Sequence, residues 1–335
     1  MSPSHPRARP SPARGLAIAA LAALLIGAAG SRGAVTAGPT QMTFASPEEA
    51  VQALVGAVKA EDRKALAAIL GPEGRPLIWS GDRVADAQGR ERFLRAYEQA
   101  HTLESATDTK AILVIGQNEW PLPIPLVKEG DTWRFDTAAG KEEILNRRIG
   151  RNELNAMQVC LAYVDAQREF ARVAREGDGL LKYAMKLYSD RGKKNGLYWR
   201  TTEGEVESPL GELVAKARAE GYTRTRSGGK PTPYHGYLYR ILTAQGPDAP
   251  GGAYDYVVDG KMIGGFALVA FPARYGVSGV MTFIVNHQGV LYQKDLGTDT
   301  ARAARAMPAY NPDNTWKKVE AATAPTREPA GPRSP

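Results

Sequence analysis

Cysteine and histidine are scarce in this sequence of 335 residues, and each shortage removes a class of chemistry. The single cysteine, Cys160, excludes a disulfide within the chain and a cysteine-based metal cluster, and its place on an apolar helical stripe is typical of a buried core thiol. Three of the four histidines, His101, His235 and His287, lie far apart and form no paired ligand motif. We therefore expect no metal site and no cofactor.

Recognisable catalytic motifs are also missing. The stretch from Gly276 to Gly279 approaches a serine nucleophile elbow, but a glycine-bounded turn before a strand accounts for Ser278 without chemistry. Neither a phosphate-binding loop nor a dinucleotide-binding glycine motif is present. Carboxylates such as Asp255, Asp259 and Asp295 lie beside predicted strands or turns, where solvated roles are usual. The sequence thus predicts no catalytic residue and favours a protein that is not an enzyme.

Positive charge is in modest excess. The formal charge is +7, and four arginines lie within the first 37 residues, where no acidic residue offsets them. Loss of these four positive charges would lower the formal net charge of the chain from +7 to +3. Because no dense run of lysine or arginine occurs in the remaining chain, the sequence does not have the basic footprint of a nucleic-acid binder.

The amino-terminal segment is typical of a signal peptide. A basic stretch, residues 7–14, precedes an apolar run, residues 15–29, which is shorter than the roughly 20 residues that span a bilayer. Cleavage after Ala37 fits the small residues Val35 and Ala37, and residues 28–30 offer an earlier site. The alternative is a retained membrane anchor. We expect a signal peptide at 1–37, no membrane span after cleavage, and a periplasmic or secreted protein.

Residues 46–150, after a linker at 38–45, are predicted to form a first α+β domain. Ser46 and Glu49 make a capping box at the start of an amphipathic helix, and two further helices follow. The runs 111–115, 122–127 and 132–135 read as strands, and three prolines place the middle run at a sheet edge. Helices followed by a curved sheet resemble the cone-shaped fold of nuclear transport factor 2, a likeness that implies no activity.

Residues 151–319 are predicted to form a second domain, and residues 320–335 a disordered tail. A long helix from about 141 to 174, with a break near Gly150, joins the two domains, and residues 180–187 read as a short helix. The expected antiparallel strands are 234–242, 253–258, 265–271, 280–285 and 290–293.

Several sequence motifs, which follow one another in a fixed order, resemble those of a known bacterial family. They are the stretches 135–153 and 276–286, together with Asn195-Gly-Leu-Tyr-Trp199, Ser208-Pro-Leu-Gly211 and Pro233-Tyr-His-Gly-Tyr237. These residues look like the family named domain of unknown function 2950, over about residues 46–319. The resemblance implies an exported protein with the domain layout common to that family, and it brings no established activity.

The second domain also resembles the globular head of type IV pilins and pseudopilins. The likeness rests on the helix at 160–170, the phrase Ala270-Phe-Pro-Ala273 and a terminal hairpin. The chain lacks the hydrophobic assembly helix and prepilin cleavage motif of those proteins, so a pilin-like fibre is not expected.

Tyrosine and tryptophan concentrate in the second domain. These side chains combine apolar area with a hydrogen-bonding tip, which suits a sugar, peptide or partner surface. The predicted binding residues are Tyr198, Trp199, Tyr234, His235 and Tyr256. The alternative is that the aromatic side chains fill the core face of a sheet, and that His235 packs on a strand face.

The sequence favours an exported envelope protein that acts as a non-enzymatic binding or assembly module, with an unknown envelope protein or polymer as its partner. A periplasmic hydrolase, with carboxylate acid and base residues assembled from separate segments, is the alternative.

Overall fold

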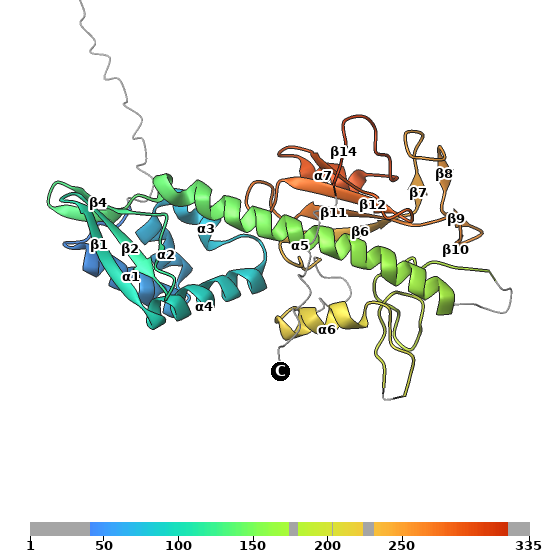
Figure 1. Cartoon of the computed structure of the whole chain (residues 1–335), viewed down its shortest axis with the longest axis horizontal. Helices are drawn as coiled ribbons and strands as arrows, with labels where there is room; N and C mark the ends of the chain where they lie inside the picture. Colours follow the sequence, from blue (N-terminus) through green and yellow to red (C-terminus); the bar gives the residue numbers. More distant parts are fainter. Residues whose placement is uncertain (1–40, 174–179, 203, 224–230, 321–335) are drawn as a thin grey trace, which may run out of the picture. The chain divides into compact units, whose positions relative to one another are not determined.

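The computed structural model describes residues 41–173, 180–202, 204–223 and 231–320, and these described residues belong to one compact unit. The predicted signal peptide and all of the predicted carboxy-terminal tail except Glu320 lie outside the described residues. Helices and antiparallel sheets make up the structure, which confirms the α+β class (Figure 1). Within the described part of the chain, no helix combines the length and the apolar character needed to cross a bilayer.

Short helices precede the first sheet. They are α1 (Pro47–Lys59), α2 (Arg63–Leu70), the 3-10 turn η1 (Pro72–Gly74), α3 (Arg75–Ile78) and α4 (Arg83–Gln99). The capping box is confirmed: Ser46 Oγ accepts from the Glu49 amide at 3.1 Å, and the Glu49 carboxylate accepts from the Ala45 amide at 3.1 Å. Asp62 and Asp82 cap α2 and α4 in the same way, by accepting from amides of the first turn.

The first sheet has the strand order β1-β2-β4-β5, with β3 paired to β2. Its strands are β1 (His101–Thr107), β2 (Lys110–Ile115), β3 (Trp120–Pro121), β4 (Leu126–Glu129) and β5 (Thr132–Phe135). The predicted edge strand at 122–127 is wrong. Pro123 and Pro125 remove two backbone donors, so no strand forms over 122–125, although the Leu122 amide still donates to the Leu113 carbonyl of β2 at 2.7 Å. Strand β4 begins at Leu126, between β2 and β5.

Helix α5 (Thr137–Val173) is continuous over 37 residues and passes through Gly150, where the sequence predicts a break (Figure 1). A lone helical glycine costs only about 1 kcal/mol relative to alanine, which a long packed helix tolerates. Ile144 packs on the first core, and the second core begins at Ala156 on the same helix. One helix therefore contributes to both hydrophobic clusters.

The second sheet is antiparallel throughout, in the order β14-β13-β12-β11-β6. Its strands are β6 (Tyr237–Leu242), β11 (Ala267–Pro272), β12 (Met281–Asn286), β13 (Leu291–Asp295) and β14 (Lys317–Lys318). Short ladders join β7 (Ala244–Gln245) to β8 (Tyr254–Asp255) and β9 (Val257–Val258) to β10 (Lys261–Met262), and the helices of this part are α6 (Gly211–Ala219) and α7 (Thr300–Ala306). The predicted strand 253–258 is thus divided between β8 and β9.

The predicted helix at 180–187 does not form. Gln167 of α5, which is fully buried, takes both backbone groups of Ala184: its amide donates to the carbonyl at 2.7 Å and its oxygen accepts from the N–H at 2.8 Å. This clamp holds the segment in an extended conformation. Cys160, also on α5, is fully buried as expected, and burial raises the pKa of its thiol far above the usual value.

Two glycines of α5 provide a matched test of this helix. A Cβ at Gly140 would collide with the Pro123 carbonyl, whereas a Cβ at Gly150 would meet nothing within 4 Å. Gly150→Ala should raise the free energy of unfolding by about 0.5–1 kcal/mol, because alanine favours a helix. Gly140→Ala should lower it by about 1–3 kcal/mol through overpacking. Urea denaturation measures both, and a destabilised Gly150→Ala would contradict a continuous helix.

Candidate functional site

The five aromatic and histidine residues that the sequence selects do not form one surface. Tyr256 is fully buried, with its hydroxyl donating to Gln245 at 2.9 Å, and Trp199 is 7% exposed. Both belong to the second core, as the core-packing alternative states. Tyr198 is half-buried beside Tyr188, with ring centroids 5.7 Å apart.

Tyr234 and His235 lie together in the turn before β6. Their ring centroids are 4.1 Å apart, and Tyr222 lies 4.9 Å from Tyr234. His235 has a left-handed φ of 50° and therefore does not pack on a strand face, contrary to the sequence alternative. Its Nε2 is 3.3 Å from the Glu220 carboxylate; burial lowers the pKa of His235, and Glu220 opposes that shift.

Asp82 connects this turn to helix α4. Its carboxylate is 1% exposed and accepts from the Tyr222 hydroxyl at 2.9 Å and from the Gly236 amide at 2.8 Å, while it also caps α4. The sequence pattern of an N-cap is visible at Asp82, but its partners lie about 140 and 154 residues away along the chain. The Asp82 carboxylate therefore joins the start of α4 to Tyr222 and to the turn before β6, and we call this set of contacts the Asp82 junction.

A separate hollow lies among the first helices, the first sheet and α5. We call it the cavity; its volume is about 450 Å³, within the range of roughly 300–1,000 Å³ that is usual for small-molecule sites. Its interior is apolar, and the side chains that line it include Leu54, Val58, Leu66, Leu70, Leu77, Ile78, Phe93, Ile115, Trp120, Leu122, Ile124 and Ile144.

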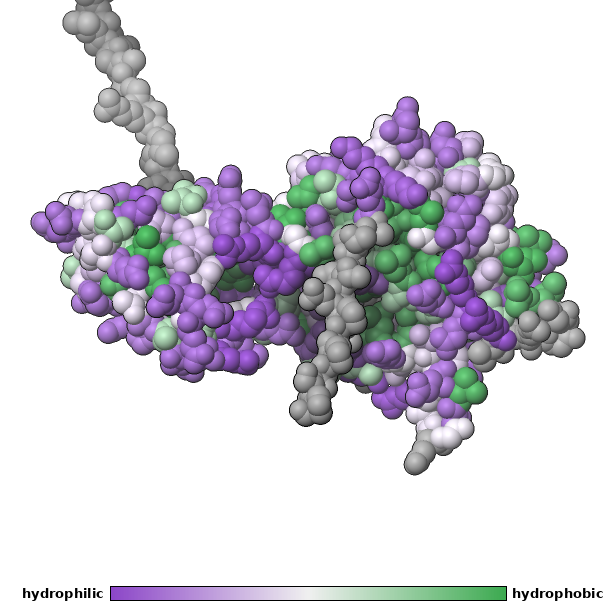
Figure 2. All heavy atoms as spheres, viewed as in Figure 1, coloured by the Kyte–Doolittle hydropathy of each residue, from purple (hydrophilic) through white to green (hydrophobic). Residues whose placement is uncertain are grey.

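The mouth of the cavity is polar and rich in arginine. Arg90 and Arg92 come from α4, and Arg148 and Arg151 come from α5, which brings two helical faces together. Arg148 donates to the Pro76 carbonyl at 2.7 Å and to the Leu77 carbonyl at 2.8 Å, so its guanidinium is fixed in place. Hydrophilic residues cover much of the visible face in Figure 2, with hydrophobic areas between them.

Like charges crowd this mouth. Burial lowers the pKa of Arg92 and the charge of Arg151 lowers it further, while the charge of Glu91 opposes this shift. Burial also lowers the pKa of Arg148; Asp86 opposes this shift, whereas Arg151 and Arg274 add to it. Since a bound anion would relieve this repulsion, the arrangement suits a negatively charged head group.

Asp86 is the one carboxylate among the described residues that line the cavity. Both of its oxygens accept from the Ser80 amide at 3.2 Å. Burial raises the pKa of Asp86, while the hydrogen bonds from Ser80 and the charge of Arg148 lower it. The charge of Asp82 also raises the pKa of Asp86, but Asp82 does not line the cavity and already accepts hydrogen bonds from Tyr222 and Gly236. The cavity itself therefore presents a single carboxylate among its described lining residues.

The structure also contains no ligand set for a metal: no group of three or more histidine, cysteine, aspartate or glutamate residues converges in the described ranges. The sequence did not predict the cavity, because Asp86, Gly89 and Arg90 make this face of α4 look like a solvated helix surface. The recurrence of Asp86, Arg90 and Phe93 at helical spacing was the available signal.

Comparison with known families gives one match, which covers most of the chain. The family described as "Protein of unknown function (DUF2950)" matches residues 41–319. The chain belongs to the DUF2950 family. No curated protein and no solved structure matches it. Family membership confirms the resemblance to this one family found in the sequence and assigns no activity, so functional inference for this DUF2950 protein rests on its own geometry.

Removing one hydroxyl tests the Asp82 junction. Tyr222→Phe leaves the buried Asp82 carboxylate without one of its donors and the His235 amide without its acceptor. We expect the free energy of unfolding to fall by about 1–3 kcal/mol. Tyr254→Phe, at a tyrosine that is 38% exposed, should change it by less than about 0.5 kcal/mol. Equal effects of the two variants in thermal unfolding would contradict the junction.

Proposed function

We propose that this protein is an exported, non-enzymatic binding module, and that the cavity holds a small molecule with an apolar body and one anionic head. The observation that supports this most strongly is the meeting of an apolar hollow with a crowded group of guanidinium side chains at its mouth. Each part selects a different part of the ligand.

The apolar lining selects the body of the ligand. Burying apolar surface contributes roughly 25 cal/mol per Å², so a hydrocarbon chain that fills the interior supplies most of the affinity. The guanidinium groups select the head, because charge-assisted hydrogen bonds to a carboxylate are among the strongest that proteins make. Arg148 is already committed to two carbonyls, and Arg90 is paired with the Glu61 carboxylate at 2.9 Å. Of the four arginines at the mouth, this leaves Arg92 and Arg151 as the head-binding residues.

A hydrolase is less well supported. Asp86 has the raised pKa of a candidate proton donor, but the carboxylate beside it, Asp82, is hydrogen-bonded to Tyr222 and Gly236 and does not line the cavity. Hydrolysis of an ester analogue of the ligand, lost in Asp86→Asn, would favour that alternative over binding alone.

The finer fold assignments belong to the same proposal. We infer that α1–α4 and the first sheet have the cone-like architecture of nuclear transport factor 2, and that α5 with the second sheet resembles a pilin head. The cavity enclosed by helices and sheet supports the first likeness. The long helix against an antiparallel sheet supports the second. Neither likeness supplies an activity.

Calorimetry with three probes tests the ligand class. Decanoate has both the chain and the charge, decanol has the chain alone, and acetate has the charge alone. We expect decanoate to bind more tightly than decanol by about tenfold, equivalent to about 1.4 kcal/mol, and acetate not to bind measurably. Arg151→Gln should remove the preference for decanoate, while Arg95→Gln, at an exposed arginine of α4 outside the cavity lining, should keep it.

Two glycine variants separate loss of binding from loss of folding. Gly89 lines the cavity, and a Cβ there would first meet Arg92 at 4.0 Å; Gly56 is exposed on α1 with nothing within 4 Å. Both Gly→Leu variants should gain helix stability. Only Gly89→Leu should stop decanoate binding, and decanoate binding that survives Gly89→Leu would exclude the cavity as the site.

The proposed export predicts a processed protein. The expected product outside the cytoplasm begins at Gly38, because cleavage follows Ala37. Sequencing the amino terminus of the protein recovered from the periplasm or medium measures this directly. An intact chain that begins at Met1 and stays in the cytosolic fraction would contradict the proposal.

A further inference from the structure

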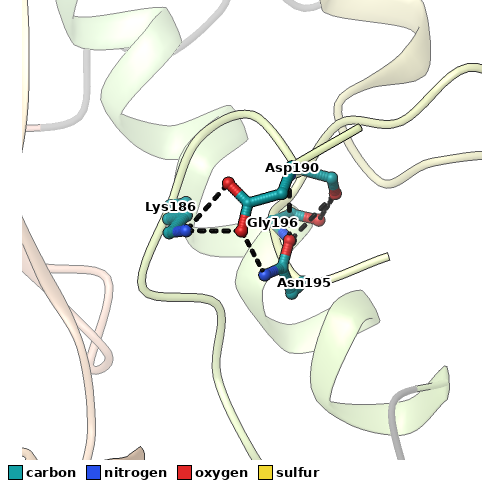
Figure 3. A network of polar contacts seen from close by, with 5 residues as sticks. Lys186, Asp190, Asn195 and Gly196 are labelled. Carbon is teal, nitrogen blue, oxygen red and sulfur yellow. Dashed lines mark hydrogen bonds and ion pairs between the residues drawn. The ribbon is translucent and has the colours of Figure 1, made fainter. Parts of the chain in front are cut away.

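A braced loop, residues 189–196, presents a cluster of cations away from the cavity. Ser189 Oγ accepts from the Gly196 amide at 2.9 Å, and Asn195 accepts from the Asp190 amide at 3.0 Å while donating to its carboxylate at 2.8 Å (Figure 3). Lys186 adds an ion pair to Asp190 at 2.7 Å. These bonds close the loop on itself and fix the backbone at its base.

The side chains beside this loop surround a second hollow of about 740 Å³, which we call the loop pocket. Five cations line it: Arg191, Lys193, Lys194, Arg200 and Arg218. Among its described lining residues the carboxylates are Asp190 and Glu205, and Lys186 with Asn195 already engage the first. The loop pocket therefore has an excess of positive charge.

Two aromatic rings hold cations of the loop pocket in place. The Arg218 guanidinium lies 5.1 Å from the ring centroid of Tyr198, and the Lys194 ammonium lies 5.7 Å from that of Trp199. The Trp199 indole is itself buried and donates to the Val206 carbonyl at 3.4 Å. Stacked cations keep their N–H groups available, and their restricted motion lowers the entropy cost of binding an anion.

The same geometry disfavours the stacking of a neutral sugar on Tyr198 and Trp199. Arg218 and Lys194 lie over the ring faces on which an uncharged sugar would stack. The cations come from the loop tip, from Arg200 and from helix α6, so they meet several negative groups of one ligand rather than a single one. This distribution matches a chain with repeated anionic groups.

We propose that the loop pocket binds an anionic polysaccharide, in which carboxylate or phosphate groups recur along a sugar chain. Arg191, Lys193 and Lys194 contact successive anionic groups at the exposed tip, and Arg218 contacts a group inside the pocket. The cavity takes no part in this binding, so the proposal for the loop pocket can be tested independently of the proposal for the small-molecule site.

Oligogalacturonate binding to the full chain tests the polysaccharide, with dextran as the neutral control and a single-stranded oligonucleotide of matched charge as the competing polyanion. The combined variant Arg191→Gln, Lys193→Gln and Lys194→Gln should weaken oligogalacturonate binding at least about tenfold at low salt. A control with Arg63→Gln, Lys64→Gln and Lys317→Gln removes the same charge from exposed sites elsewhere, and should weaken it less than about twofold.

Asn195→Ala tests the bracing without removing a cation. It should weaken oligogalacturonate binding several-fold and leave decanoate binding unchanged, since the loop loses its fixed shape while the cavity does not change. Equal losses in the two triple variants would overturn the loop pocket as the site. Equal binding of the oligonucleotide would overturn the sugar assignment, and dextran binding as tight as that of oligogalacturonate would overturn the role of charge.

Discussion

A single long helix has to bury apolar side chains in two different cores, and this constraint determines where polar groups collect. Ile144 of α5 packs on the first core, and Ala156 and Cys160 on the same helix pack on the second. The turns between them belong to neither core. There the helix presents Arg148, Arg151, Asn152 and Glu153, side chains that a continuous apolar stripe would not tolerate.

Each of these polar side chains is used. Asn152 donates to the Ser278 carbonyl at 2.8 Å, and Glu153 accepts from the Val280 and Met281 amides at 2.9 Å, so both tie α5 to the second sheet. Arg148 and Arg151 line the mouth of the cavity instead. The same stretch of helix therefore joins the two cores and supplies positive charge beside an apolar hollow.

The sequence predicts those elements whose signal is local. The capping box at Ser46, the α+β class and the buried Cys160 follow from residues that are neighbours in sequence or share one helix face. The sequence did not predict the continuity of α5, because the low helix propensity of Gly150 carries no information about how the helix packs on either side of that residue. The extended segment at 180–187 was missed because Gln167, a distant buried amide, decides its conformation.

The candidate site was harder to predict for the same reason. Its mouth combines Arg92 of α4 with Arg151 of α5, and no local pattern relates these two positions. The aromatic residues selected from composition were divided by the fold: Tyr256 fills the core, Tyr234 and His235 form a turn, and Tyr198 supports a cation. Residue type alone does not distinguish these roles, because each depends on what lies opposite the ring.

The most direct test of an amphipathic anion in the cavity is a crystal structure of the protein grown with decanoate that bears bromine on its terminal carbon. The account predicts anomalous density for bromine among the apolar side chains around Leu66 and Phe93, with the carboxylate at Arg92 and Arg151. Bromine bound only outside the cavity, or a carboxylate turned toward the apolar interior, would contradict it.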